Sequence, residues 1–402
     1  MWHRHSCLCA LGRPEPVCIG SFSPGRTDKS VCATRDETTA DVWRAATAVA
    51  ALHNAHRMVR VPINGIGVIA PGAIGVDAFR AQLASGASAI APVDRFDTSG
   101  LRTHDAALVR DFKPKDFIAP MKMRRMNGLS RFAVAAAKLA IDDAGGAIGA
   151  DTGVAMGTAF GPVQTSVEYM KEYVEKGAAL APPQLFAESV ANAPGSHIAI
   201  EWGLRGFNVT ITQRESSALA AAMYACAQLL KGSARAALIG GVEEVNEMLF
   251  SVLDRLGGCA MGEGSAVLVA NAGTRKPYAW LSGFGIARDT TATISDWGED
   301  ASAVARAMRA ALDDAELDTV DAIYASANGN VRADRLEARA IEALFGDRVP
   351  IVKTKQIFGE YAAGGMLQFV AAILAVDEQR YDRVLVNSLS AGGGIVCAVV
   401  TS

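Results

Sequence analysis

Two hydrophobic periods alternate along the chain from Val61 onward. Short, nearly continuous apolar runs bounded by glycine, asparagine or proline are typical of buried strands, whereas apolar residues at every third or fourth position are typical of helices. The runs predict strands in the first half of the chain at residues 61–70, 151–158, 208–212, 236–241 and 265–270. Further strands are expected near residue 281 and at residues 322–326, 350–354, 384–389 and 396–400.

The helical period fills the gaps between these strands. It predicts helices at residues 76–85, 131–144, 163–176, 216–231, 301–315, 335–344 and 364–376. Gly145 and Gly146 follow the second helix and are expected to end it. The third helix carries an apolar stripe on one face, formed by Val163, Val167, Met170 and Val174. Strands that alternate with helices in two comparable halves predict a layered α/β architecture with mostly buried sheets.

The same pattern divides the chain into three parts. Residues 1–57 mix proline, serine, arginine and aspartate without periodicity and lack the apolar stretch of a secretion signal, so we expect a disordered extension or a start codon placed too early. Residues 58–274 and 275–402 form the two comparable halves. A chain of 402 residues is long enough for two core-bearing units of ordinary size.

Composition excludes several kinds of partner. The formal net charge is -3, which gives no field to attract nucleic acid or an anionic membrane surface. Half of the residues are hydrophobic, but no uncharged apolar run reaches the roughly 18 residues that a membrane span needs. We therefore expect neither nucleic acid nor a membrane among the partners.

The seven cysteines are too few and too scattered for a disulfide framework. Cys226, Cys259 and Cys397 fall in segments that are predicted to be core, which fits a reducing cytoplasm. The remaining four lie in the N-terminal segment together with His3 and His5, and they are Cys7, Cys9, Cys18 and Cys32. A metal site there has to be considered, but His-x-His-x-Cys-x-Cys is not a standard zinc spacing, so we predict no metal.

A series of short motifs then appears in a fixed order between Val61 and Val400. They are Gly65-Ile66-Gly67-Val68, Asp111-Phe112-Lys113-Pro114, Met123-Arg124-Arg125-Met126, Ala191-Asn192-Ala193, Gly206-Phe207-Asn208, Gly240-Gly241-Val242-Glu243, Met261-Gly262-Glu263-Gly264 and Gly392-Gly393. In this order and spacing they resemble the β-ketoacyl-ACP synthases of the thiolase fold. The resemblance implies a five-layer αβαβα fold with two duplicated halves and no cofactor of the chain's own.

The resemblance also places the family's catalytic triad of one cysteine and two histidines. Glu215 stands at the cysteine position, where a thiolate at a helix N-terminus accepts the acyl chain. Asn328 stands at the first histidine, with Asp334 and Glu337 at matching offsets. Glu360 stands at the second histidine, five residues after Lys355, which we expect to pair with a carboxylate such as Glu337. No histidine occurs beyond His197, so two acids and an amide replace the thiol and both imidazoles.

Two further departures lie near the same site. The glycine-rich loop that ends in Gly392 and Gly393 has Leu389 and Ala391 where the family usually carries aromatic gatekeepers. The span from Gly241 to Met261 is roughly half the length that the resemblance implies. Losses of this kind are similar to those of the chain-length factors of type II polyketide systems, although these typically carry glutamine at the cysteine position and here Gln213 lies two places earlier.

Three hypotheses follow for function. The first is a chain-length-factor-like, catalytically degenerate subunit that forms a heterodimer with an active ketosynthase and works with an acyl carrier protein bearing a phosphopantetheine-bound acyl chain. The second is an active acyltransferase with another nucleophile, for which Ser216, Ser217 and Cys226 are candidates. The third is a stand-alone module that binds an acyl group or a carrier protein. Under the first hypothesis we expect the acyl tunnel to be shaped by Phe160, Gln164, Val167 and Met170.

Overall fold

The computed structural model describes residues 17–18, 32–33, 60–257 and 259–402. The chain forms two compact units, Met1–Arg57 and Met58–Ser402. In the first unit β1 (Val17–Cys18) pairs antiparallel with β2 (Cys32–Ala33). The expectations about the conformation of the extension and about a metal site lie outside the described residues, because that site would need His3, His5, Cys7 and Cys9.

The larger sheet of the second unit is built from two similar halves. In the first half the strand order is β8-β7-β9-β11-β3, with β7 parallel to β8 and β9, and β11 antiparallel to β9 and β3. These strands are β3 (Val61–Ala70), β7 (Gly153–Gly157), β8 (Asn208–Ile211), β9 (Ala237–Glu243) and β11 (Gly264–Ala270). β8 lies at one end of the sheet, so only one of its edges is paired.

The second half repeats this topology strand for strand. The order is β14-β13-β15-β16-β12, with β13 parallel to β14 and β15, and β16 antiparallel to β15 and β12. These strands are β12 (Ala279–Arg288), β13 (Ala322–Tyr324), β14 (Ile351–Val352), β15 (Arg383–Leu389) and β16 (Gly394–Thr401). Residues Ala279–Leu281 of β12 pair with Val61–Ile63 of β3 and join the halves.

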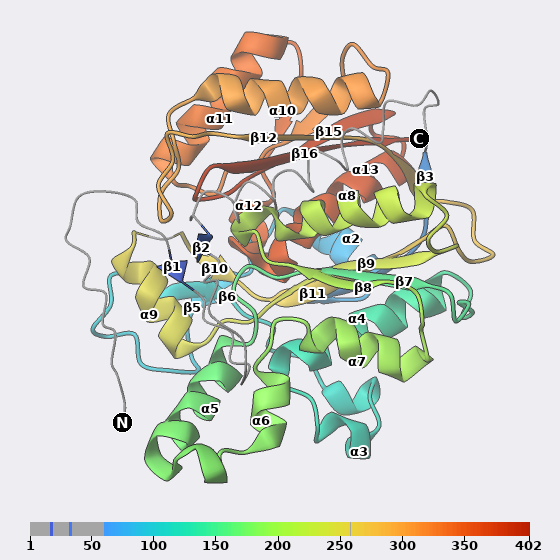
Figure 1. Cartoon of the computed structure of the whole chain (residues 1–402). Coiled ribbons are helices and arrows are strands. Elements are labelled where there is room, and N and C mark those ends of the chain that lie inside the picture. Colours follow the sequence, from blue (N-terminus) through green and yellow to red (C-terminus); the bar gives the residue numbers. More distant parts are fainter. Residues whose placement is uncertain (1–16, 19–31, 34–59, 258) are drawn as a thin grey trace. The chain divides into compact units, whose positions relative to one another are not determined.

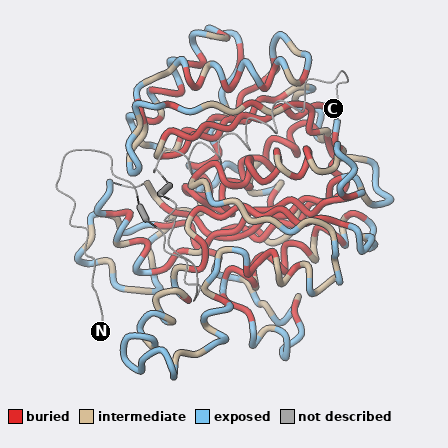
Figure 2. Tube along the Cα trace, in the orientation of Figure 1, coloured by how far each residue is buried: buried red, intermediate tan, exposed pale blue. Residues whose placement is uncertain are grey.

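Helices form three layers around the two halves of the sheet (Figure 1). The outer layers hold α4 (Gly128–Asp143) and α7 (Ala193–Trp202) on one side, and α10 (Ala301–Asp314) and α11 (Val331–Phe345) on the other. The middle layer holds α8 (Ser217–Leu230) and α13 (Met366–Asp377), where burial is most complete (Figure 2). Five alternating layers with two duplicated halves confirm the predicted thiolase-like fold.

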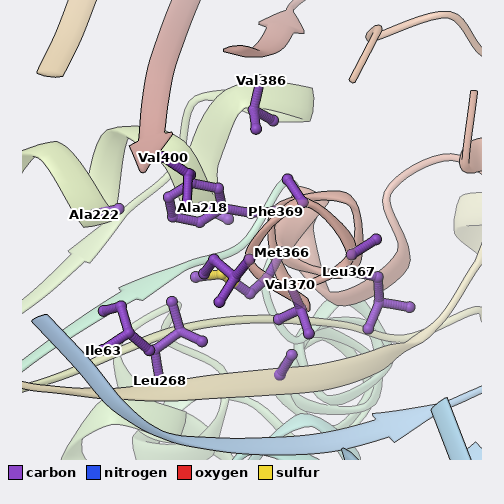
Figure 3. Packing of buried hydrophobic residues seen from close by; sticks show 14 of the residues in the cluster. Ile63, Ala218, Ala222, Leu268, Met366, Leu367, Phe369, Val370, Val386 and Val400 are labelled. Atoms are coloured by element: carbon purple, nitrogen blue, oxygen red, sulfur yellow. The ribbon is translucent and has the colours of Figure 1, made fainter. Parts of the chain in front are cut away.

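The middle layer is the main core. Met366, Phe369 and Val370 of α13 lie between Ile63 and Leu268 of one half-sheet and the strands of the other (Figure 3). All of α13 from Met366 to Val376 is buried, so this helix has no polar face. A helix that is apolar all round is expected where both of its sides meet sheets.

Paired glycines bring one helix close to each half-sheet. A Cβ on Gly65 would lie 2.3 Å from the Ala140 carbonyl oxygen of α4, and one on Gly67 would lie 1.9 Å from that of Ala136. In the second half Gly283 and Gly285 stand in the same relation to α10, at 2.5 and 2.0 Å from carbonyl oxygens of Ala311 and Ala307. Only glycine fits so close to a helix backbone, so the duplication extends to the packing of individual residues.

Shorter elements surround this framework. The remaining helices are α2 (Val76–Ser85), α3 (Pro120–Met123), α5 (Val163–Lys176), α6 (Pro183–Glu188), α9 (Glu247–Arg255) and α12 (Lys355–Phe358). The 3-10 turns are η2 (Pro114–Asp116), η3 (Ala178–Leu180), η4 (Arg214–Ser216) and η5 (Ala362–Gly365). Short strands β5 (Ile90–Pro92), β6 (Asp105–Ala107) and β10 (Met261–Gly262) form a small separate sheet, and β4 (Ala73–Ile74) pairs with β3. In the part of the chain that the structure describes, no helix is long and apolar enough to cross a membrane.

Candidate functional site

Three chain segments meet where strands of the two halves end. Glu215 lies in η4, between β8 and the start of α8, and its side chain is buried. Asn328 lies in the loop that follows β13, and its Nδ2 donates to Glu360 Oε2 at 2.5 Å. Tyr361, which follows Glu360, donates from its hydroxyl to Glu215 Oε1 at 2.9 Å. The structure therefore brings together Glu215, Asn328 and Glu360, the three residues singled out in the sequence.

The Glu215 carboxyl is enclosed by hydrogen-bond donors. Besides the Tyr361 hydroxyl, the Ala391 backbone N–H donates to Oε2 at 3.1 Å, and an Arg214 guanidinium nitrogen lies 3.9 Å from Oε1. Burial raises the pKa of Glu215, and the nearby charge of Glu360 raises it further. This acid is held in place by its neighbours and is shut off from solvent.

Glu360 forms a buried ion pair with Lys355. The Lys355 Nζ lies 2.7 Å from Glu360 Oε1, and 6% and 1% of the two side chains are exposed. Lys355 thus pairs with a carboxylate, as expected, but the partner is not Glu337, which accepts from Ser326 N at 2.9 Å and from Asn387 Nδ2 at 3.0 Å. Glu360 lies two residues beyond the end of α12, and its carboxylate reaches Lys355 at the start of that helix.

Two supporting groups fix the loops around the site. Asp334 at the start of α11 accepts from the backbone N–H groups of Asn328 and Gly329, at 3.0 and 3.2 Å. Gly392 and Gly393 both have positive φ, and a Cβ on Gly393 would lie 2.1 Å from the Asp289 carbonyl oxygen. The turn that these glycines allow aims the Ala391 N–H at Glu215.

Within the described residues, the alternative nucleophiles have no neighbouring base. Ser216 Oγ bonds Ser390 Oγ at 2.7 Å, and Ser217 Oγ donates to the Thr158 carbonyl oxygen at 3.0 Å. Cys226 is buried in α8, and burial raises the pKa of its thiol. The two histidines in the described ranges, His104 and His197, bond Thr98 and Glu188 respectively. A hydroxyl without an adjacent base is a poor nucleophile.

Comparison with known proteins agrees with the architecture. Residues 58–274 match the model of the beta-ketoacyl synthase N-terminal domain, and residues 278–386 match that of the C-terminal domain. The chain belongs to the beta-ketoacyl synthase family. The two family models cover both halves of the fold, but the fold alone does not determine the chemistry, which depends on the residues at the site.

Individual relatives span most of the chain. A 3-oxoacyl-[acyl-carrier-protein] synthase 2 of Vibrio harveyi is 27% identical over 359 residues, which cover 80% of this chain and 86% of the relative. A Streptomyces cyaneus protein, named among the polyketide beta-ketoacyl synthases, is 30% identical with the same coverage. Among solved structures, the ishigamide ketosynthase/chain length factor has a TM-score of 0.77 and 24% identity, and the match covers 86% of this chain and all of that one.

The residues expected to shape an acyl tunnel lie in two different settings. Phe160 packs inside its own subunit, with its ring centroid 4.9 Å from that of Tyr361. On α5, Gln164 is exposed and bonds Glu168, Val167 is half-buried, and 52% of Met170 is exposed. The α5 stripe therefore does not pack the subunit's own core along its length, since Val174 is also 75% exposed.

The sequence did not point to three residues at this beta-ketoacyl synthase site. Tyr361 and Arg214 enclose Glu215, and both have left-handed backbone conformations that no sequence period reveals. Cys259, expected in the core, is only partly buried, and burial together with the charge of Glu360 raises its pKa to about 12. A thiol with so high a pKa stays protonated and is a poor nucleophile.

Glu243, at the end of β9, is a fully buried acid. Its Oε2 accepts from the Ala159 backbone N–H at 2.6 Å, whereas Oε1 has no hydrogen-bond partner within the described part of the chain. Burial raises its pKa from 4.5 to about 8. At pH values between 4.5 and about 8, Glu243 therefore holds a proton in the folded chain that it has lost in the unfolded chain.

Stability should therefore fall as pH rises through this window. Glu243 contributes a loss of about 1.4 kcal/mol in the free energy of unfolding per pH unit, and the slope should flatten above pH 8. Urea unfolding of the wild type and of Glu243→Gln between pH 5.5 and 7.5 measures this difference in slope. Equal slopes, or a wild type that gains stability with pH relative to Glu243→Gln, would contradict the assignment.

Proposed function

We propose that this chain is a non-condensing, chain-length-factor-type subunit that assembles with an active ketosynthase in polyketide, polyene or fatty-acid-like biosynthesis. The observation that carries the proposal is the enclosed cluster of Glu215, Asn328 and Glu360, which occupies the family's three catalytic positions as the sequence motifs place them. Membership of the beta-ketoacyl synthase family and the similarity to a solved ketosynthase/chain length factor support a ketosynthase-like subunit of this type.

These residue types are unsuited to condensation. A glutamate acyl acceptor would give a mixed anhydride, and its charge would repel a malonyl carboxylate. Asn328 can donate a hydrogen bond to a developing oxyanion, but an amide cannot shuttle protons. Its Nδ2 is moreover already bonded to Glu360, which in turn is held by Lys355. The cluster satisfies its own hydrogen bonds and leaves no reactive group free.

The direct test compares the chain alone with the assembled pair. The purified chain should give no condensation of acyl-ACP with malonyl-ACP, whereas its complex with a cognate ketosynthase that keeps cysteine and both histidines should be active. The ketosynthase without this chain is the control for background turnover. Robust condensation by the unmodified chain on its own would overturn the proposal and favour the acyltransferase alternative. Carrier-protein binding without any ketosynthase complex would favour a stand-alone binding module.

Two surface features support a protein partner. β8 ends the sheet and presents an unpaired strand edge, which is a template for pairing with another chain. Helices α5 and α6 lie outside the layered core (Figure 1). Together with the η3 turn between them, they expose large apolar side chains, namely Met170, Tyr173, Val174, Leu180 and Phe186. A permanent heterodimer of this kind should bury more than about 2,000 Å², and the exposed stripe of α5 would then also shape the cavity for the growing chain.

A charge placed on α5 should prevent assembly. Val174→Glu is expected to reduce recovery of the cognate ketosynthase in a co-purification at least tenfold, because a carboxylate would be desolvated in an apolar interface. Val331→Glu is a matched control, because Val174 and Val331 are 75% and 70% exposed and Val331 lies on α11, away from α5. Equal recovery with both variants would remove α5 from the interface.

A basic surface supports the carrier protein as the second partner. Lys113, Lys115, Arg124 and Arg125 lie within one stretch of the chain, and all four are exposed. None of them forms an ion pair with another described residue, although the chain as a whole carries a net charge of -3. A local excess of free cations favours an acidic partner.

A further inference from the structure

The Tyr361 side chain fills the centre of the candidate site. It is 5% exposed, and its ring belongs to an apolar cluster with Leu108, Leu249 and Met261. One face of the group is closed by Phe160, whose ring meets that of Tyr361 edge-on, and the Arg214 guanidinium lies 5.3 Å from the Phe160 centroid. Side chains from three distant segments thus pack together beside Glu215.

The backbone holds Tyr361 in this position. Tyr361 and Ala363 have φ of 66° and 52°, and Arg214, beside Glu215, has φ of 51°. Left-handed conformations are strained for non-glycine residues, and they persist where the surroundings fix them. Packing does so here, because a Cβ on Gly241 would lie 2.0 Å from the Ala363 carbonyl oxygen. The turn that carries Tyr361 is therefore packed at Ala363 directly against β9.

Little space remains beside this side chain. The cavity lined by Lys355, Phe358, Glu360 and Tyr361 measures about 10 Å³, enough for at most one water molecule. The hydroxyl of Tyr361 is also bound, since it donates to Glu215 Oε1 at 2.9 Å. An extended acyl chain could enter only if the ring moved out.

We propose that Tyr361 is a plug that keeps acyl chains out of this subunit's own pocket, with its hydrogen bond to Glu215 as the latch. The proposal deepens the proposed function and rests on it in one respect, since it assigns the growing chain to the partner's side of the interface. Removing the ring should leave an apolar cavity, of the kind that binds small aromatic molecules when it is lined by residues such as Leu108 and Leu249.

The experiment uses the full-length chain without a partner, so its outcome does not depend on heterodimer formation. p-Cresol, which has the shape of a tyrosine side chain, and toluene, which lacks the hydroxyl, are titrated into the wild type, Tyr361→Phe and Tyr361→Ala. Only Tyr361→Ala should bind them, with p-cresol about tenfold tighter because of the Glu215 latch. In Tyr361→Ala/Glu215→Ala this preference should disappear.

Fatty-acid uptake provides the second measurement. cis-Parinaric acid, which fluoresces in apolar sites, should bind Tyr361→Ala saturably and be displaced by p-cresol, while the wild type and Tyr361→Phe should not take it up. Saturable uptake by the wild type, or a folded Tyr361→Ala that binds none of the probes, would overturn the proposal. If Tyr361→Ala cannot be purified, p-cresol should restore its yield and Tyr361→Leu should take up the fatty acid, and failure of both would also overturn it.

Discussion

Replacing Lys355 with methionine should lower the free energy of unfolding by about 3–5 kcal/mol. The change leaves Glu360 buried without its counter-charge, while the bonds from Asn328 Nδ2 and the Tyr361 backbone N–H remain. A single uncompensated charge in the interior costs far more than the pair contributes, because desolvation is no longer offset. Urea unfolding followed by circular dichroism measures the loss.

Two further variants make this result interpretable. Lys138→Met removes a pair of similar length, 2.8 Å to Asp142, at a site where both side chains are about half exposed. Its cost should stay within about 1 kcal/mol. Lys355→Met combined with Glu360→Gln removes both charges and should recover most of the stability. If Lys355→Met lowers the free energy of unfolding no more than Lys138→Met does, the buried Lys355–Glu360 pair does not stabilise the fold.

Restoring the family triad should not create a condensing enzyme. Glu215→Cys, Asn328→His and Glu360→His together are expected to leave turnover at or below roughly a thousandth of that of a cognate ketosynthase, since acid–base groups contribute only when they are correctly placed. Glu360→His deprives the buried Lys355 of its carboxylate, and the Tyr361 ring still fills the space that the substrate would need. Product formation from acyl-ACP and malonyl-ACP is the measurement.

Alkylation of the introduced thiol shows whether small molecules can reach the site, independently of whether the site can catalyse condensation. The new thiol of the triple variant should react slowly with iodoacetamide, and adding Tyr361→Ala should accelerate the reaction if the plug blocks access. Turnover of the triple variant within tenfold of a genuine ketosynthase would show that residue identity alone had silenced the site. Fast alkylation without turnover would instead place the defect in proton transfer.

The regular part of the fold was predictable because its signals are local. The predicted bounds of β3, α2 and α5 agree with those in the structure, and α4 was predicted only three residues short at its start. α7 and α9 were not predicted: Pro194 and Gly195 stand in the first turn of α7, and α9 occupies a span that the resemblance marked as shortened. Proline and glycine weaken the helical pattern of α7, whereas α9 has a regular apolar face, formed by Leu249, Phe250 and Leu253, that was not assigned from the sequence.

The sequence motifs indicated which residues lie at the candidate site, but they did not indicate which of these residues would bond to one another. Motif spacing located Glu215, Asn328 and Glu360, and the structure places them in one hydrogen-bonded group. Lys355 pairs with Glu360, beyond the end of α12, and not with Glu337 of α11. The turn that follows Tyr361 packs at Ala363 against Gly241, which is far away in sequence. Such long-range geometry leaves no local pattern in the chain.

The pairing of β3 with β12 also has a consequence for biosynthesis. Val61, at the start of the layered unit, pairs with Leu281, which belongs to the second half. During translation the first half must therefore leave the ribosome with one edge of its sheet open, until the strand that closes it has been made. Sheets completed by such distant partners fold slowly and are exposed to aggregation meanwhile. Chaperone supply and the timing of synthesis should thus govern the yield of this protein more than its final stability does.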